Sequence, residues 1–239
     1  MNQDNVNWIH VDHYDEMSKQ AALIFKEQIE KKPDSVLGLA TGGTPIGFYQ
    51  ELIKLYKEGL SFSQVKTFNL DEYVGISPQD ITSYHAYMQE HLFQHIDIPS
   101  ENIHLPNGMV EDLEAECARY EAAIAACEGI DLQLLGIGVN GHIGFNEPGT
   151  PFTSTTHVVT LAERTRLENA KYFPNGQKVP EHAITMGIKT IMQAKKIVLL
   201  AFGENKMHTM QQLREGPVTE SVPASRLKEH TNVEVICGK

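Results

Sequence analysis

The sequence predicts an α/β fold in which a doubly wound, mainly parallel sheet carries helices on both faces. Short runs rich in Val, Ile, Leu and Phe alternate with longer amphipathic stretches, and this alternation is typical of a parallel sheet covered by helices. The 239 residues are 41% hydrophobic and 21% charged, a globular composition. No repeat and no Gly/Ser-rich linker marks a boundary, so we expect a single domain over residues 1–239.

Four apolar runs have the length and composition of buried strands. They are residues 35–40, 65–70, 131–138 and 196–202. Two weaker strand candidates are residues 157–161 and 233–237. The stretches between these runs are expected to cover the sheet as helices.

Three stretches have the spacing of covering helices, namely residues 15–30, residues 46–57 and a helix that opens at Asp112. In the third stretch the apolar residues recur at steps of three and four positions, so they share one face. These residues are Leu113, Cys117, Tyr120, Ile124 and Cys127.

Residues 141–180 depart from the alternation, because Gly, Pro, Thr and Asn dominate there around a short helical patch at residues 162–173. An irregular excursion of this length is usually functional. We predict that residues 152–179 form a lid.

Charge and cysteine content exclude several classes of protein. The chain has 20 Lys and Arg against 31 Asp and Glu, a formal net charge of −11; a nucleic-acid binder or a polybasic membrane anchor would need a basic excess. The longest apolar run, residues 197–202, is far shorter than the roughly 20 residues that cross a bilayer. The N-terminus has no signal or transit pattern, and three cysteines without a CxxC pair suit a reducing compartment. We therefore expect a cytoplasmic protein.

The first strand is followed by Thr41, Gly42, Gly43, Thr44 and Pro45 and then by a helix. Consecutive glycines let the backbone approach an anion, their N–H groups form a nest, and the helix dipole adds to the attraction. The loop lacks the GxxxxGK[ST] pattern of nucleoside triphosphate sites. It predicts a phosphate site, and a simple strand-to-helix turn is the alternative.

Asp71 and Glu72 directly follow the strand predicted at residues 65–70. An acidic pair at a strand end supplies a general base. Alternatively, the Asp71 carboxylate caps the next helix. The sequence supports the two interpretations equally.

The third strand leads into a Gly-rich loop that carries His142 and Glu147. A carboxylate near a His holds it in one tautomer for proton exchange near neutral pH; a solvated loop His is the alternative. After the fourth strand, Lys206 lies at a helix start, where a cation opposes the helix dipole unless a bound anion offsets it. Otherwise it is an exposed Lys on a solvated face.

Ligands of open α/β sheets bind outside the carboxyl ends of the strands. A phosphate nest, a carboxylate, a His/carboxylate loop and a lysine at four such ends predict an enzyme that acts on a small phosphorylated substrate by proton transfer. This set of residues requires no metal.

A GxGxxG match at residues 136–141 follows a strand. That motif must open a helix to bind a dinucleotide, and Gly144 and Pro148 prevent a helix here. We therefore expect no nicotinamide cofactor.

His91 and His95 have the i, i+4 spacing of one helix face but lack a third metal ligand of suitable spacing. A helix surface or a dimer contact is the favoured interpretation. Tyr84, Tyr87 and Phe93 are expected to be core residues of the same helix.

Four strings are recognisable together: LGLATGGTP at residues 37–45, FNLDEYVG at 68–75, LLGIGVNGHIGFNEPGT at 134–150 and ITMGI at 184–188. Through them the chain resembles the glucosamine-6-phosphate deaminase family. The resemblance implies a Rossmann-like fold of the sugar-phosphate isomerase/deaminase type. It also implies a hydrolase of amino-sugar catabolism and N-acetylglucosamine degradation, which converts glucosamine 6-phosphate and water into fructose 6-phosphate and ammonia without an organic cofactor or a metal.

The resemblance also assigns roles to single residues. Asp71 moves the proton from C2 to C1 through an enolamine, and His142 opens the pyranose ring with the help of Asn140 and Glu147. The phosphate is held by the loop after the first strand and by two lysines, one of them from the lid. These phosphate-binding residues are Thr41, Gly42, Gly43, Thr44, Lys206 and Lys171.

Two departures from the family pattern affect the site. Asn140 replaces the Asp of many longer members, so we expect His142 to be oriented mainly by Glu147. Lys171 replaces an Arg, which keeps the charge but loses the bidentate geometry of a guanidinium.

A third departure concerns regulation and assembly. His157 and Val159 stand where hexameric members carry basic residues of an allosteric site. Together with the short tail, this implies an unregulated enzyme of the shorter bacterial type, a monomer or small homo-oligomer rather than a hexamer. Its partner is the small-molecule substrate, with no nucleic acid and no membrane.

Two alternative functions remain. A hydrolase like 6-phosphogluconolactonase shares the fold and a Gly-His loop, although the FNLDEY string and the Glu147-Pro148 pair argue against it. A non-catalytic sugar-phosphate sensor would not need the acid/base set.

Overall fold

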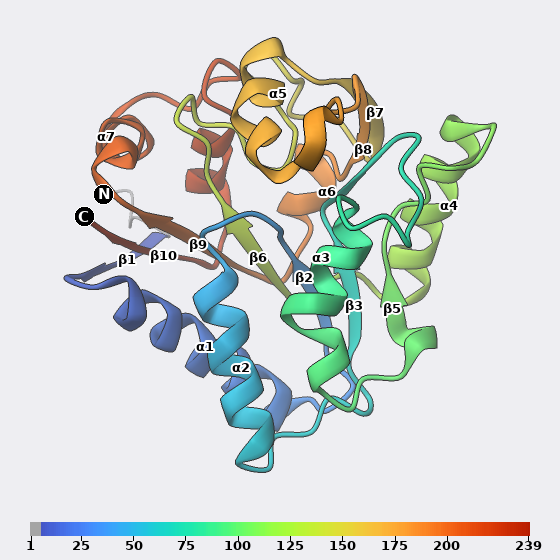
Figure 1. The fold of residues 1–239 in the computed structure, drawn as a ribbon. Helices are drawn as coiled ribbons and strands as arrows, with labels where there is room; N and C mark the ends of the chain where they lie inside the picture. The colour runs from blue at the N-terminus through green and yellow to red at the C-terminus, as the bar shows by residue number, and fades with distance from the viewer. Residues whose placement is uncertain (1–5) are drawn as a thin grey trace.

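A seven-stranded sheet organises the molecule (Figure 1). The structure is a computed structural model that describes residues 6–239, apart from the side chain of Asn175. The strands are β1 (Val6–Val11), β2 (Val36–Leu39), β3 (Lys66–Asn69), β5 (Ile103–His104), β6 (Leu132–Gly136), β9 (Lys196–Phe202) and β10 (Val233–Gly238). Every pairing in this sheet is parallel. The predicted doubly wound, mainly parallel sheet is confirmed.

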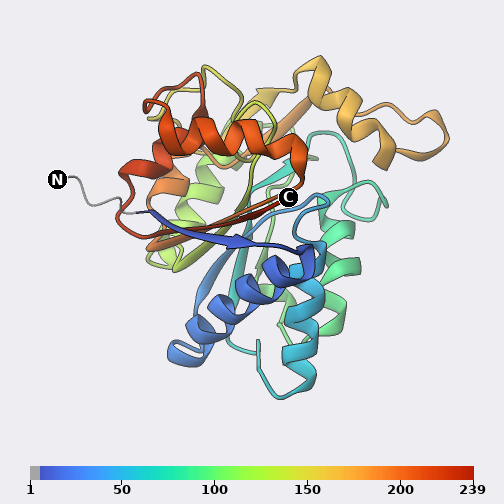
Figure 2. The same ribbon diagram turned by 90° about the vertical axis from the view of Figure 1, so that its left-hand side faces the viewer.

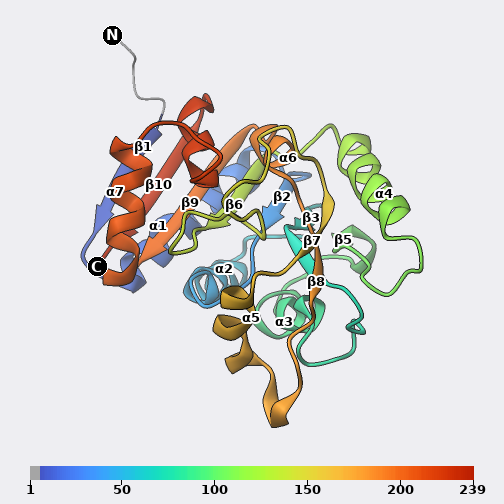
Figure 3. The same cartoon turned by 90° about the horizontal axis from the view of Figure 1, so that it is seen from above.

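The strand order is β1-β10-β9-β6-β2-β3-β5, as Figure 3 shows from above. From β2 the chain runs outward through β3 to β5, then returns to the other side of β2 with β6. The order therefore reverses between β2 and β6. A crevice opens at the carboxyl ends of such a strand pair, so the loops after β2 and β6 face each other there.

Helices cover both faces of the sheet. They are α1 (Tyr14–Lys31), α2 (Ile46–Lys57), α3 (Tyr84–His91), α4 (Leu113–Ala126), α5 (Glu163–Asn169), α6 (Ile188–Met192) and α7 (Met207–Glu215). Figure 2 shows α1 and α2 on one side of β1 and β10, with α7 on the other. In Figure 3, α3 lies on the side of α1 and α2, and α4 and α6 lie on the opposite side.

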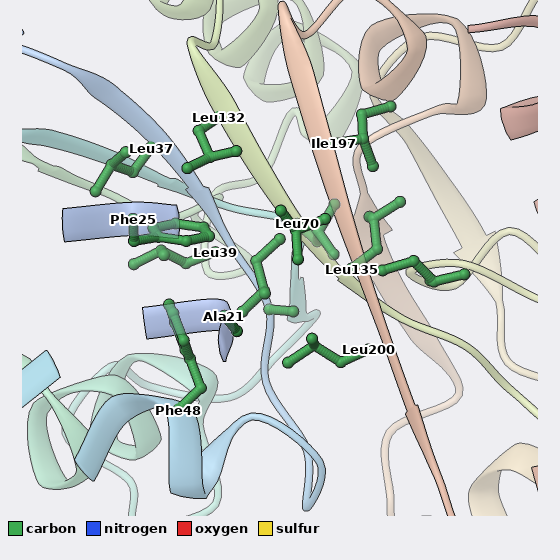
Figure 4. Close-up of a cluster of buried hydrophobic side chains, with 14 of the residues drawn as sticks. Ala21, Phe25, Leu37, Leu39, Phe48, Leu70, Leu132, Leu135, Ile197 and Leu200 are labelled. Atoms are coloured by element: carbon green, nitrogen blue, oxygen red, sulfur yellow. The ribbon is translucent and has the colours of Figure 1, made fainter. Parts of the chain in front are cut away.

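One part of the core lies between the sheet and the helix pair α1–α2 (Figure 4). The rings of Phe25 and Phe48 meet edge to face with centroids 4.8 Å apart, and Leu39, Leu135 and Leu200 fill the sheet side. All five side chains are at most 1% exposed. Strands covered on both faces read as continuous apolar runs, which is why these strands could be predicted.

The helix ends follow local rules. Asp112 caps α4 by accepting a hydrogen bond from the N–H of Ala115 at 2.9 Å, as its residue type favours. The predicted bounds of residues 46–57 and 196–202 agree with α2 and β9. The predicted pairing of His91 and His95 on one helix is wrong, because α3 ends at His91 and Phe93–His95 forms a separate 3₁₀ turn.

A second sheet was not predicted. It has three antiparallel strands in the order β4-β8-β7, namely β4 (Asp71–Tyr73), β8 (His182–Thr185) and β7 (His157–Thr160). Asp71 is thus the first residue of a strand, paired with Thr185. A three-residue strand carries too short a pattern to be read from sequence.

The segment between β7 and β8 contains α5 and two 3₁₀ turns, Ala170–Tyr172 and Pro174–Gly176. It extends away from the body of the molecule at the carboxyl end of the main sheet (Figures 1 and 2). The other 3₁₀ segments are Ser100–Asn102, Glu204–Lys206 and Pro223–Glu229.

Two further findings concern membrane-spanning helices and the cysteines. Within residues 6–239, no helix is both long enough and apolar enough to span a bilayer. Cys117, Cys127 and Cys237 are free thiols, as the odd cysteine count predicted.

Candidate active site

The loop after β2 turns its backbone into a cavity of about 230 Å³ at the carboxyl end of the sheet. Gly42 has φ +101°, a conformation that favours glycine. Within the described chain, the N–H groups of Thr41, Gly42, Gly43 and Thr44 donate no hydrogen bond. Pro45 precedes the first residue of α2, Ile46, so unpaired donors and a helix N-terminus coincide. This geometry suits an anion.

Asp71 lies in the same cavity. Its side chain is 6% exposed. Burial, and secondly the charge of Glu72, raise the pKa of Asp71 to about 8. A carboxyl group of this kind exchanges a proton at neutral pH, as a general base must.

Glu72, the second residue of the acidic pair, does not line the cavity. Its carboxylate accepts hydrogen bonds from the N–H groups of Tyr73, Tyr84 and His85 at 2.8, 3.0 and 2.9 Å. The N-cap residue of α3 is Ser83, and the carboxylate that binds the first two N–H groups of the helix is that of Glu72. The alternative that Asp71 caps the helix is wrong. Burial raises the pKa of Glu72 to about 7, against the lowering effect of these three bonds.

His142 is oriented by Asn140. The amide nitrogen of Asn140 donates to Glu147 Oε2 at 2.7 Å, so its Oδ1 faces His142 Nδ1, also at 2.7 Å. An amide oxygen only accepts, which places the ring proton on Nδ1 and leaves Nε2 as an acceptor. Glu147 itself lies 3.7 Å from Nδ1. The expectation that Glu147 mainly orients His142 is wrong, because Asn140 stands between them.

The environment keeps this imidazole neutral. Burial lowers the pKa of His142, while the charge of Glu147 acts in the opposite direction. The ring lies over Gly138, where a Cβ would fall 2.1 Å from Cε1. The glycine of the rejected GxGxxG match therefore makes room for the His142 ring. Oε1 of Glu147 accepts a hydrogen bond from Thr165 Oγ1 at 2.6 Å.

The two proton-transfer groups are neighbours across the cavity. Gly144, in the loop of His142, has φ +56°, and a Cβ there would lie 3.5 Å from Asp71 Oδ2. His142 and Asp71 both line the cavity. Two segments separated by about seventy residues thus meet because β6 and β3 flank β2.

Two lysines complete the site. Lys206 is half-buried where α7 begins and lines the cavity; burial lowers its pKa. Lys171 comes from the segment between β7 and β8, and its Nζ lies 4.9 Å from the centre of the Tyr172 ring. Both lysines lie in the same cavity as the loop after β2.

The cavity gathers most of the predicted site residues. Those that line it are Thr41, Gly42, Gly43, Thr44, Asp71, His142, Lys171 and Lys206. Asn140 and Glu147 do not line it but stand behind His142.

Several lining residues were missed by the sequence analysis. They are Tyr84, Thr165, Glu168, Asn169 and Tyr172. Tyr84 was expected in the core, yet its ring stacks on Phe145 at the cavity wall. The others lie between β7 and β8, and only the lid prediction pointed to that segment.

No cluster of three or more His, Cys, Asp or Glu side chains within residues 6–239 has the geometry of a metal site. The polar groups of the cavity include backbone N–H donors, two lysines, a buried carboxyl and a neutral imidazole. This set can bind an anion at one end and transfer protons at the other.

Comparison with known proteins agrees with this chemistry. Residues 11–236 match the family described as glucosamine-6-phosphate isomerases/6-phosphogluconolactonase. The glucosamine-6-phosphate deaminase of Lysinibacillus sphaericus is 60% identical over 98% of this chain and 99% of its own. That of Shouchella clausii is 59% identical over 98% and 95%.

Solved structures extend the comparison. A monomeric glucosamine-6-phosphate deaminase has a TM-score of 0.95 and 51% identity, and the match covers 98% of this chain and 97% of the other. A 6-phosphogluconolactonase from Thermotoga maritima has a TM-score of 0.77 at 19% identity over 98% and 100%. The second likeness concerns the fold alone.

Proposed function

The chain belongs to the family of glucosamine-6-phosphate isomerases and 6-phosphogluconolactonases, and within it we propose that it is a glucosamine-6-phosphate deaminase. The observation that carries the proposal is the meeting of the loop after β2, Asp71 and His142 in one cavity. The identity of 60% to a named deaminase over nearly the whole of both chains supports it. The reaction converts glucosamine 6-phosphate and water into fructose 6-phosphate and ammonia, a step of amino-sugar catabolism.

The phosphate binds the free N–H groups of the loop after β2, with Lys206 and Lys171 beside it. Because Lys206 is half-buried, solvent screens its charge less than that of an exposed lysine. This places the sugar's C1 end toward His142 and Asp71.

Ring opening is assigned to His142. Its unprotonated Nε2 accepts the proton of the C1 hydroxyl, the bond between C1 and the ring oxygen breaks, and that oxygen takes up a proton. The product is the open-chain aldehyde. Asn140 and Glu147 hold the ring in the tautomer that this step requires.

Isomerisation is assigned to Asp71. The aldehyde makes the proton on C2 acidic. Asp71 removes this proton while a proton of the substrate ammonium group passes to O1, which gives an enolamine with a hydroxyl group on C1. Asp71 then returns its proton to C1, which leaves an iminium group at C2. Water then adds to C2 and ammonia leaves. Because one water molecule is consumed, we assign the enzyme to the hydrolases that act on an amino sugar phosphate.

We assign a lid function to residues 152–179. Five lining residues of the cavity come from this segment, namely Thr165, Glu168, Asn169, Lys171 and Tyr172. The strand β7 pairs with β8, so the moving part begins after Thr160. The segment then covers the cavity while the two strands keep its ends in place.

For the whole chain we propose one domain over residues 1–239, acting as a monomer in the cytoplasm without allosteric activation. The similarity to a monomeric deaminase supports the assembly state. A phosphorylated sugar does not cross a membrane unaided, which supports a cytoplasmic location. The lactonase alternative is not favoured, since the chain is 60% identical to a named deaminase but 19% identical to a solved lactonase. The sensor is not favoured, since it would not need the acid/base set.

Replacing the carboxyl group of Asp71 tests its role as the general base. We expect Asp71→Asn to lower the rate of ammonia release from glucosamine 6-phosphate by roughly 10²- to 10⁴-fold, the range for loss of a general base. Asp34→Asn is the matched control, since Asp34 is exposed at the opposite end of β2. Hydrolysis of 6-phosphogluconolactone is measured in parallel.

An unchanged rate in Asp71→Asn would contradict the assigned role. Lactone hydrolysis without ammonia release would replace the deaminase by the lactonase. Binding of the sugar phosphate without turnover of either substrate would favour the sensor. Added N-acetylglucosamine 6-phosphate should leave the rate of the wild-type enzyme unchanged.

A further inference from the structure

The carbonyl groups of the loop after β2 are held by tyrosine hydroxyls. Each hydroxyl donates to a main-chain oxygen at the back of the loop. The bonds run from Tyr49 to Ala40 at 2.5 Å, from Tyr87 to Gly42 at 2.6 Å and from Tyr14 to Thr44 at 2.8 Å, with Gly43 a further 3.3 Å contact of Tyr14.

These bonds decide which way the N–H groups of the loop point. In a planar trans peptide, the C=O of one residue and the N–H of the next point in opposite directions. Holding the carbonyls of Ala40 and Gly42 against the helices therefore turns the N–H groups of Thr41 and Gly43 away from them. Both residues line the cavity, and in the described chain neither N–H donates a hydrogen bond.

The three tyrosines come from three different helices, α1, α2 and α3. Tyr49 is fully buried, and burial raises the pKa of Tyr49 and of Tyr87 well above the ordinary value. The Tyr49 and Tyr87 hydroxyls thus remain protonated donors at neutral pH. The helical framework fixes the loop before a ligand arrives, and such preorganised donors bind an anion without further ordering cost.

Tyr14 is also tied to α2. Its oxygen accepts a hydrogen bond from the N–H of Gly47 at 2.9 Å. A Cβ at Gly47 would lie 2.7 Å from Tyr14 Cε1 and 2.4 Å from Ser18 Oγ, so a side chain there would force the Tyr14 ring aside. The absence of a side chain at position 47 is what lets Tyr14 reach the loop.

We propose that Tyr14, Tyr49 and Tyr87 are positioning residues for the phosphate of the substrate, acting through the carbonyl groups of the loop after β2. They do not touch the phosphate. The inference rests on the proposed function, because it requires this loop to bind the phosphate. The competing explanation is that the hydroxyls merely satisfy buried carbonyl groups, in which case they affect stability alone.

The test replaces the hydroxyls of Tyr87 and Tyr14 one at a time, because Tyr49 is fully buried and its replacement would also affect folding. In Tyr87→Phe and in Tyr14→Phe, the Kd for inorganic phosphate, measured by calorimetry on the full chain, is expected to rise about 5-fold, the equivalent of one hydrogen bond. The KM for glucosamine 6-phosphate rises by a similar factor while kcat stays unchanged, since phosphate is held equally in the ground and transition states. Tyr56→Phe is the matched control, because Tyr56 lies on α2 and packs on Phe62 without contact to the loop.

Inorganic phosphate separates this inference from the proposed function. Wild-type affinity for phosphate in both variants, with only a lower melting temperature, would overturn the positioning role. A wild-type chain that fails to bind phosphate would overturn it as well. If the tyrosines govern phosphate affinity but no ammonia is released from glucosamine 6-phosphate, the positioning role stands and the deaminase assignment falls.

Discussion

At the residue scale, the unusual feature is a carboxyl group held where ionisation is unfavourable. Asp71 is 6% exposed, and its pKa is raised to about 8 by burial and by Glu72. Its neighbour Glu72 is equally buried but gains three backbone hydrogen bonds. The fold thus satisfies one carboxylate of the pair with hydrogen bonds, whereas burial makes the ionised fraction of the other a stronger base than an ordinary carboxylate.

This arrangement predicts how stability depends on pH. Folded Asp71 titrates near pH 8, while an unfolded Asp titrates near ~3.9. Between these values the folded state holds a proton that the unfolded chain releases, so a rise in pH lowers the free energy of unfolding. Asp71→Asn has no carboxyl group at this position, so this fall in the free energy of unfolding with pH does not occur. The stability of the variant relative to wild type should therefore grow from about pH 4 to about pH 8 and be constant outside that window.

Urea unfolding at a series of pH values measures this difference. Asp34→Asn, which alters an exposed carboxylate, should show no such growth. A difference between Asp71→Asn and wild type that is independent of pH would contradict the buried, raised pKa of Asp71.

His142 illustrates how far single residues can be predicted. The loop sequence was enough to single out His142 and Glu147 as a pair. The loop sequence was not enough to show which residue contacts the imidazole. Asn140 lies closer to it in space than Glu147 does. Only the positions of the side chains decide which group holds the ring.

At the element scale, β4 is the decisive piece. It is three residues long, yet it carries Asp71 and Glu72 and pairs with β8, more than a hundred residues away. Glu72 then fixes the start of α3, whose Tyr87 holds the loop after β2. The strand that carries Asp71 and the loop after β2 are in this way connected through α3.

The segment between β7 and β8 leads to a prediction on motion. Leu167 and Tyr172 are 69% and 48% exposed there, so the amides of this segment should exchange faster in the free enzyme than those of the main sheet. Saturation with fructose 6-phosphate should slow exchange across residues 161–173. Exchange within β9, which is buried, serves as the internal reference.

Hydrogen exchange followed by mass spectrometry reads out both segments. Slower exchange in the loop after β2 without any change at residues 161–173 would show that ligand binds but that the segment is no lid.

At the scale of the whole molecule, charge is divided between surface and site. The net charge of −11 keeps the molecule soluble but repels a phosphate at long range. Lys206, Lys171 and the loop after β2 line one cavity, and we propose that they offset this repulsion there. Composition alone therefore described the surface and not the site.

The assembly state can be predicted at the same scale. The large exposed apolar side chains found in the described chain come from five separate segments and not from one element. They are Leu23, Ile81, Met109, Leu167, Tyr172 and Met207. Obligate interfaces are large and apolar, so we expect a monomer.

Sedimentation equilibrium should give a mass near 26.7 kDa at all concentrations tested. A mass that rises toward a multiple of this value at micromolar protein would contradict the monomer.

The sequence by itself determined the class of fold and named the candidates for the reacting groups. Buried strands such as β9 are continuous apolar runs, and helix signals such as Asp112 act on residues only a few positions away. Strand-end residues such as Asp71 and His142 were recognisable because the carboxyl ends of parallel strands face one crevice.

Only the tertiary structure decided how these groups act. The second sheet, the relay through Asn140 and the hold of Tyr14, Tyr49 and Tyr87 on the phosphate loop all join segments that are distant along the chain. Hydrogen bonds depend on distance and direction within a few tenths of an ångström. That geometry is set by packing of the whole core, which no local stretch of sequence encodes.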